Sequence, residues 1–381
     1  MGVVVIGVAL AAAVLASALE TVVLPRDGFT RIARVTFAVV DRLLVRRWRN
    51  AERTASMRGM YAPVALATLP LVWMILIIVA FTGIFWGIGS GTWQRSMEIS
   101  GSSVTTLGFA APTGAGKSWI AFVEAVIGLG LVALLISYLP TIYAAHHDRE
   151  KGIRTLRPFA GTPASSEQML TNFRRFQAIS NDATWETASQ WLLELDQTHC
   201  SFPALSYFPE TSPTQSWVAS VGALLDTAAL IVSTSETPLS QTDLGENQGP
   251  LLVLAHGIPS IVRIGRAIGL PIDPPATLID LLASGADGKP TEAISISQEE
   301  FTGVVDRCSR QANIPRPDMD VAWQRFQALR STYDHALRGL AGLTIAAPAP
   351  WTTDRPAKVG RPRLVTNRPL RADWSLPAIT N

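Results

Sequence analysis

Residues 105–118 hold both motifs in this chain that could carry chemistry. One of them, residues 111–118, fits a relaxed nucleotide-binding pattern: an alanine, four further residues and then Gly116-Lys117-Ser118. In such a loop, backbone N–H groups and the lysine bind phosphates, and the loop joins a strand to a helix. Here a polar stretch precedes the motif and an apolar run follows it. This context favours another role for the segment.

The other motif is T-T-L-G-F, residues 105–109, and it lies between two apolar runs. It resembles the selectivity filter of the potassium channel family that has two membrane helices and one pore loop per subunit. There a T-T-V-G-Y-G-D run follows a short pore helix, which residues 93–104 would form here. The resemblance covers roughly residues 60–150. It implies that the Thr106 hydroxyl and the backbone carbonyls as far as Phe109 replace the hydration shell of an ion.

The main departures from the family pattern lie at two neighbouring positions, and Phe109 in place of the family's tyrosine is a milder one. Ala110 and Ala111 stand where the family has a glycine and an aspartate. Filter glycines adopt backbone conformations that cost other residues energy, so the ion selectivity stays open. The candidate ion pathway comprises Thr105, Thr106, Leu107, Gly108, Phe109 and Ala110.

Three residues of the following apolar run complete the candidate site. Glu124 is an ionisable residue about one turn inside the run, and such residues in membrane helices often serve function. It would support the filter or set the field in the pore, or else be an interfacial glutamate. Gly128 and Gly130 allow close helix packing and would permit bending of an inner gating helix.

Three stretches without charged side chains are long enough, at about 20 residues, to cross a bilayer as helices: residues 1–19, 62–88 and 126–145. The first could instead be a signal peptide. It lacks a basic start, however, and Glu20 and Pro25 occupy the region of a cleavage site. We therefore expect a membrane helix over 1–25.

Basic residues set the expected orientation, because cytoplasmic loops are enriched in them. Nine arginines lie between the first two runs. Residues 26–60 should therefore form a cytoplasmic linker, with 29–50 as a basic amphipathic helix on the inner leaflet or as a plain connecting helix. The pore module, 61–148, then has its pore loop, 92–118, on the outer side of the plasma membrane.

The C-terminal half has the pattern of a helical cytoplasmic domain over 160–345. Capping-box signatures begin at Ser165 and Ser297, and apolar residues recur at helical spacing. The clearest such helix spans 319–340. Residues 346–381 hold six prolines and six basic residues, which predicts a disordered basic tail. The expected fold is all-α, with membrane helices, a re-entrant pore loop and an all-α cytoplasmic domain.

The composition excludes several classes of protein. Of the 381 residues, 48% are hydrophobic and 16% are charged, and the net charge is +2. In typical soluble domains the charged share is about 25%. These values argue against a wholly soluble chain, a disordered chain and a dedicated nucleic-acid binder. His199 and Cys200 could form a nucleophile pair, but the side chains of adjacent residues seldom point at one another. We expect no catalytic residue, no metal and no cofactor.

The leading hypothesis is a cation channel, potassium-like, in which the helical domain regulates or assembles the pore. Its partners would be the lipid bilayer and monovalent cations. The family resemblance implies a homotetramer, because four loops surround one axis. A non-conducting membrane anchor that presents the helical domain as a binding or sensing module is the alternative. A membrane-bound nucleotide-binding protein is the third hypothesis.

Overall fold

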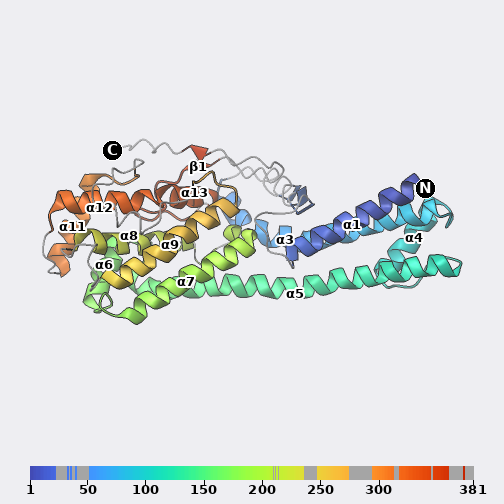
Figure 1. The fold of residues 1–381 in the computed structure, drawn as a ribbon, viewed down its shortest axis with the longest axis horizontal. Coiled ribbons are helices and arrows are strands. Elements are labelled where there is room, and N and C mark those ends of the chain that lie inside the picture. Colours follow the sequence, from blue (N-terminus) through green and yellow to red (C-terminus); the bar gives the residue numbers. More distant parts are fainter. Residues whose placement is uncertain are drawn as a thin grey trace. The chain divides into compact units, whose positions relative to one another are not determined.

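The computed structural model describes residues 1–22, 51–208, 210, 212, 214–235, 247–273, 294–312, 317–344, 346–359, 372–373 and six residues between 32 and 40. The chain folds into two compact units, and the boundary between them in the sequence lies between Ala145 and His146. The regular secondary structure of the described residues is helical apart from two strands of two residues each (Figure 1), so the all-α fold class is confirmed. The predicted linker helix over 29–50 lies almost wholly outside the described residues.

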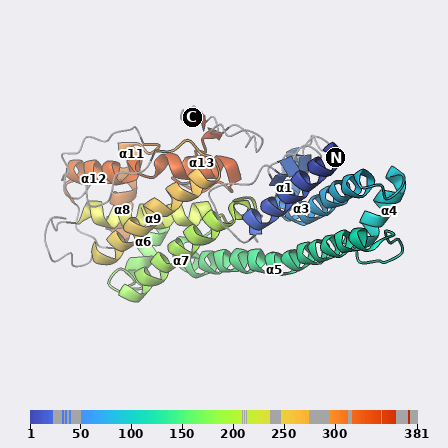
Figure 2. The ribbon, with the colours of Figure 1, turned by 45° about the vertical axis from the view of Figure 1, so that its right-hand side comes forward.

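The N-terminal unit contains α1 (Gly2–Val22), α3 (Ala51–Gly87), α4 (Trp93–Val104) and the first part of α5 (Ala115–Ala160). Helices α1 and α3 lie side by side and run antiparallel (Figure 2). A Cβ atom at Gly7 would come within 2.6 Å of the Ala80 carbonyl oxygen. Glycine at this position therefore lets the two backbones approach closely, as is usual between membrane helices.

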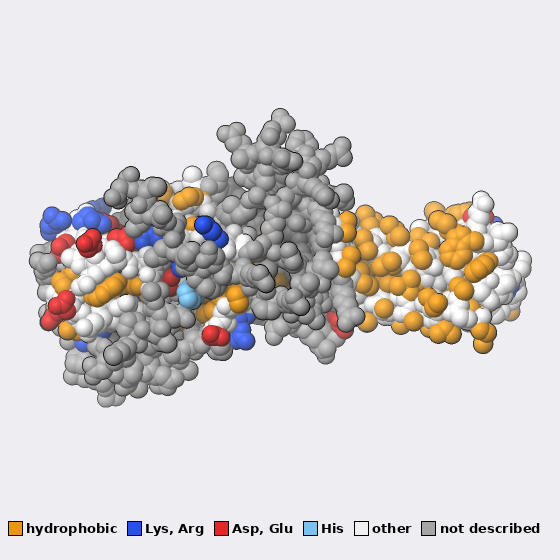
Figure 3. All heavy atoms as spheres, turned by 90° about the horizontal axis from the view of Figure 1, so that it is seen from above, with side chains coloured by type: hydrophobic (Ala, Val, Ile, Leu, Met, Phe, Trp, Pro, Cys, Tyr) orange, Lys and Arg blue, Asp and Glu red, His pale blue; other side chains and the backbone are white. Residues whose placement is uncertain are grey.

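Among the described residues, four helices are long and apolar enough to cross a membrane: Gly2–Thr21, Leu66–Gly87, Ala115–Ala160 and Trp217–Thr234. The first three overlap the predicted runs. Hydrophobic side chains spread over the visible surface of the N-terminal unit (Figure 3). Helix α5 continues without a break to Ala160, beyond the predicted end of the pore module at residue 148.

The C-terminal unit begins in α5 and adds a set of shorter elements. They are α6 (Ser166–Arg175), α7 (Asp182–Ser201), η1 (Pro203–Tyr207), α8 (Trp217–Thr234), α9 (Gln248–Ala267), α11 (Gln298–Ala312), α12 (Met319–Ser331), α13 (Asp334–Thr344), β1 (Lys358–Val359) and β2 (Ala372–Asp373). Strands β1 and β2 pair antiparallel. Both predicted N-caps are present, since Ser165 Oγ accepts from the Gln168 N–H and Ser297 Oγ accepts from the Glu300 N–H. The capping box is complete at Ser297, whose N–H donates to the Glu300 carboxylate at 2.9 Å, whereas the Ser165 N–H donates to the Ala160 carbonyl.

Helix α8, the fourth apolar helix, is the core of this unit. An evenly apolar helix either spans a membrane or lies inside a protein. In α8, every residue from Trp217 to Ser233 is buried within the protein itself. Helices α6, α9, α12 and α13 pack around it. The packing therefore accounts for the apolar character of α8 without a bilayer.

The predicted helix over 319–340 is interrupted. Helix α12 ends at Ser331 and α13 starts at Asp334. At the break, Tyr333 turns inward and its hydroxyl donates to Asp226 at 2.7 Å. The apolar spacing continues through the break, because both helices pack against α8. Spacing alone therefore could not reveal the interruption.

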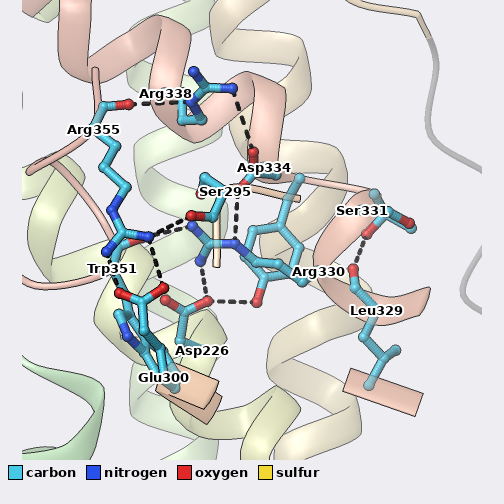
Figure 4. A network of polar contacts seen from close by, with 12 residues as sticks. Asp226, Ser295, Glu300, Leu329, Arg330, Ser331, Asp334, Arg338, Trp351 and Arg355 are labelled. Atoms are coloured by element: carbon cyan, nitrogen blue, oxygen red, sulfur yellow. Dashed lines mark hydrogen bonds and ion pairs between the residues drawn. The ribbon is translucent and has the colours of Figure 1, made fainter. Parts of the chain in front are cut away.

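A buried ionic network centres on Arg330 (Figure 4). The Arg330 guanidinium is fully buried and donates to Asp226, to Asp334 at 3.0 Å and to the Trp351 carbonyl at 2.7 Å. Burial by itself lowers the pKa of this guanidinium, but the two carboxylates outweigh burial and raise it. The network joins α8, α12, α13 and the segment after α13.

The first part of the predicted disordered tail is ordered. Trp351 is buried against the core of the C-terminal unit. Arg355 pairs with Glu300 and its carbonyl accepts from Arg338 at 3.1 Å (Figure 4). Residues 346–359 therefore pack on the helices through long-range ionic and aromatic contacts, although they have no periodic pattern. Apart from 372–373, residues 360–381 lie outside the described part.

Candidate functional site

Helix α4 has the limits predicted for the pore helix, residues 93–104. The Thr92 hydroxyl caps it by accepting from the Arg95 N–H at 3.2 Å. The unusual polarity of this helix has two sources. Arg95 pairs with Glu98 on an exposed side at 3.1 Å. Several serines lie instead on the buried side: Ser96, Ser100 and Ser102.

Contacts with α3 and α5 fix the position of α4. The Ser100 hydroxyl lies 3.1 Å from the Ile78 carbonyl, and Ile78 is nine residues before the end of α3. At 1.5 Å per residue, α4 reaches about 14 Å back along α3. Its last residue, Val104, lies against Gly128 of α5. The loop that starts at Thr105 therefore begins beside the middle of both apolar helices.

The candidate filter loop begins with a tight helix-capping turn. The Thr106 N–H donates to the Ser103 carbonyl at 3.0 Å, and the Leu107 N–H donates to the Ser102 carbonyl at 3.0 Å. This pair of bonds defines a Schellman cap, whose central residue is usually a left-handed glycine. Here that residue is Thr106, with φ +57°. A left-handed conformation costs such a residue about 1–2 kcal/mol.

The middle of the loop faces outward. Leu107 and Phe109 are 69% and 67% exposed, and Gly108 between them has φ +73°. In the part of the chain that the structure describes, nothing donates a hydrogen bond to the carbonyls of residues 106–109. Ala110 closes the loop, since it is buried and its N–H donates to the Ser102 hydroxyl at 3.0 Å. Ser102 thus holds both ends of an exposed arc.

The nucleotide-binding pattern has a different setting from a phosphate-binding loop. The Lys117 ammonium donates to the Gly89 carbonyl at 2.7 Å, so it ties the start of α5 to the turn after α3. A positive charge there is favourable, because the carbonyl end of a helix carries partial negative charge. The only strands in the described ranges lie at residues 358–373. The motif therefore lacks a preceding strand in the structure.

The two glycines of the candidate hinge have different surroundings. A Cβ atom at Gly128 would overlap the Val104 carbonyl oxygen, so glycine is required for α4 to pack on α5. A Cβ atom at Gly130 would meet nothing within 4 Å. Glu124 lies one turn before Gly128, is fully buried and pairs with the Ser100 hydroxyl.

Arg149 holds the far half of α5 in the C-terminal unit. Its guanidinium is buried and donates to the Leu205 carbonyl at 2.9 Å, and it also contacts His146 and Glu150 at 3.1 and 3.2 Å. In the sequence, Arg149 stands shortly after the third apolar run in a mostly basic stretch, residues 148–157. The basic cluster after the apolar run gave no sign that one of its members is buried.

His199 lies buried near this cluster and does not face Cys200. Its Nδ1 is 2.9 Å from the Leu195 carbonyl, and its ring packs 4.9 Å from that of Trp217. The Cys200 thiol instead donates to Asp196 at 3.4 Å. Burial, with the charge of Arg149, lowers the pKa of His199 to about 3.

We expect His199 to make the C-terminal unit sensitive to acid. An unfolded histidine has a pKa of about 6.5, so below that pH the unfolded chain binds a proton that the folded chain excludes. The free energy of unfolding should fall by up to about 1.4 kcal/mol per pH unit as the pH drops from 6.5 towards 3. His199→Phe should lose less stability between pH 7 and pH 5 than the wild type, as measured by tryptophan fluorescence during thermal unfolding. The exposed His147→Gln variant should keep the full loss; equal acid losses in all three proteins would contradict the prediction.

Comparison with family models, with curated proteins and with solved structures found no match for this chain.

Proposed function

We propose that the chain is a subunit of a membrane cation channel in which residues 105–110 form the ion path. The observation that carries the proposal is the exposed arc at the end of α4. Four consecutive carbonyls, from Thr106 to Phe109, take no hydrogen bond from the described residues. Carbonyl oxygens of this kind can replace the hydration shell of a cation.

The electrostatics of α4 favour the same ligand. The carbonyl end of a helix carries about half a negative charge, and α4 ends at Val104, directly before the arc. The N–H groups of Thr106 and Leu107 are already bound to carbonyls of α4. The arc therefore presents acceptors, which suit a cation and not an anion.

The depth of the arc supports a re-entrant arrangement. The apolar part of α3, Leu66–Gly87, is long enough to span a bilayer, and α4 reaches back to Ile78 near its middle. With α3 and α5 in a membrane, the loop would start about half-way across the hydrocarbon core. Residues 111–114 would then return the chain to the outer surface.

A complete pore requires several copies in this proposal. One chain supplies one arc, and the resemblance to potassium channels implies four around an axis. Phe122 and Val126 of α5 are exposed, as are Leu107 and Phe109, which leaves apolar surface for neighbouring subunits and lipid. The C-terminal unit would lie in the cytoplasm beneath the plasma membrane as a regulatory or assembly domain.

Potassium flux into liposomes that contain the purified protein tests the proposal. We expect the wild type to carry flux and Ser102→Ala to reduce it about tenfold, because the buried Ala110 N–H loses its acceptor at a cost of about 1–3 kcal/mol. Ser103→Ala is the matched control, since among the described residues the Ser103 hydroxyl bonds only within its own helix, to the Ile99 carbonyl at 2.8 Å. It should keep wild-type flux.

The alternative function makes the opposite prediction. A membrane anchor that presents the helical C-terminal unit would carry no flux in any variant. Ala110→Gly, which restores the residue of the potassium channel filter, separates the two: it should change the ratio of potassium to sodium flux in a channel and change nothing in an anchor. Folded wild-type protein without flux under potassium or sodium gradients would refute the channel.

A further inference from the structure

Glu124 is the one buried carboxylate among residues 64–145, and its surroundings determine its protonation state. The side chain projects from α5 and is fully buried. One carboxyl oxygen pairs with the Ser100 hydroxyl, and the other has no partner among the described residues. The Ser100 oxygen also lies 3.1 Å from the Ile78 carbonyl. Three polar groups from three helices thus form one chain of contacts.

The number of hydrogens available for these hydrogen bonds indicates that Glu124 is protonated. The Ser100 hydroxyl has one hydrogen to donate, and the Ile78 carbonyl has none. If Ser100 donates to Ile78, the contact between Ser100 and Glu124 is a hydrogen bond only when the carboxyl group supplies the hydrogen. A protonated Glu124 satisfies both contacts at once.

The alternative, an ionised Glu124, has little to stabilise it. Its carboxylate would accept one hydrogen bond, from Ser100, and its second oxygen would have none. Burying a charge without a partner costs several kcal/mol. The other charged residues between 64 and 145 are engaged elsewhere: Arg95 with Glu98, and Lys117 with the Gly89 carbonyl.

We propose that Glu124 is a proton-binding site that holds α4 between α3 and α5. The neutral carboxyl group donates to Ser100, and Ser100 donates to Ile78. Loss of the proton leaves a buried charge in this contact, so the docking of α4 depends on proton occupancy. This proposal concerns the packing of the helices and stands whether or not the chain conducts ions.

Infrared spectroscopy of the full-length protein in liposomes at pH 7 tests the proposal, because a protonated carboxyl group has a carbonyl band separate from that of a carboxylate. The difference spectrum between the wild type and Glu124→Gln should show one carboxylic acid band, lost in the variant. Gln has the same shape and can donate to Ser100, so the fold should be kept. Glu98→Gln, which removes an exposed carboxylate, should leave the band unchanged.

Two results would overturn the proposal. The first is a difference spectrum that shows a carboxylate band and no acid band. The second is an acid band that disappears when sodium or potassium is added at constant pH, because the site would then bind a cation in place of a proton. Ser100→Ala should shift the band without removing it, since the carboxyl group loses its hydrogen-bond partner; an unshifted band would also count against the contact.

Discussion

Gly128→Ala should abolish cation flux, whereas Gly130→Ala, two residues further along α5, should keep it. A Cβ atom at position 128 would overlap the Val104 carbonyl oxygen, and a backbone atom cannot rotate away as a flexible side chain can. Val104 can move only with α4, which Ser100 fixes to α3. Helix α4 would have to leave its place, and the loop after it would lose its position.

Gly130→Ala is a matched control for this prediction. It introduces the same methyl group into the same helix, but the new atom would meet nothing within 4 Å. Both changes raise helix propensity by up to about 1 kcal/mol, so the difference between them reports the contact with α4. Overpacking costs about 1–3 kcal/mol, occasionally more. We expect Gly128→Ala to lower the melting temperature in detergent and Gly130→Ala to hold or raise it; similar flux and melting in both variants would show that α4 does not dock here.

Arg330→Met should destabilise the C-terminal unit more than any surface substitution. Removing one partner from a buried ion pair costs about 3–5 kcal/mol, because the remaining charge has no partner. Here two carboxylates, Asp226 and Asp334, would lose their common guanidinium. In a domain of this size, 1 kcal/mol shifts the melting temperature by about 2–4 °C. The expected loss is therefore about 6–20 °C.

The partial repair of this defect distinguishes buried charge from lost packing. In Arg330→Met combined with Asp226→Asn, one of the orphaned charges is removed, so the double variant should melt higher than Arg330→Met alone. Arg307→Met is the surface control, since Arg307 pairs with Glu167 while half exposed, and exposed pairs contribute about 0–1 kcal/mol. A double variant less stable than the single one would show that the charge of Asp226 is not the main cost.

Local patterns were sufficient to predict the helices that carry them. The limits of α4 follow from the resemblance to the pore helix of potassium channels, whereas the capping residues Ser165 and Ser297 and the three apolar helices follow from neighbouring residues, since caps and apolar spacing act over one or two turns. The same local information placed Gly128 and Gly130 together, although only Gly128 lies against another backbone. Which of two nearby glycines faces a neighbour depends on the rotation of the helix.

Contacts between distant residues were not predictable from one sequence. Arg330 meets Asp226, which lies 104 positions earlier, and Arg149 meets the Leu205 carbonyl, 56 positions later. Each arginine belongs to a stretch that fits a solvated or membrane-flanking role by composition. The order of residues 346–359 was missed for the same reason, because Arg355 and Trp351 find their partners across the fold and not along the chain.

Electrical recording from purified protein in planar bilayers tests the central claim most directly. With a gradient of potassium chloride across the membrane, we expect single-channel currents whose reversal potential has the sign of the potassium equilibrium potential. These currents should be lost in Gly128→Ala and kept in Gly130→Ala. Absence of currents from folded wild-type protein, or a reversal potential with the sign set by chloride, would contradict it.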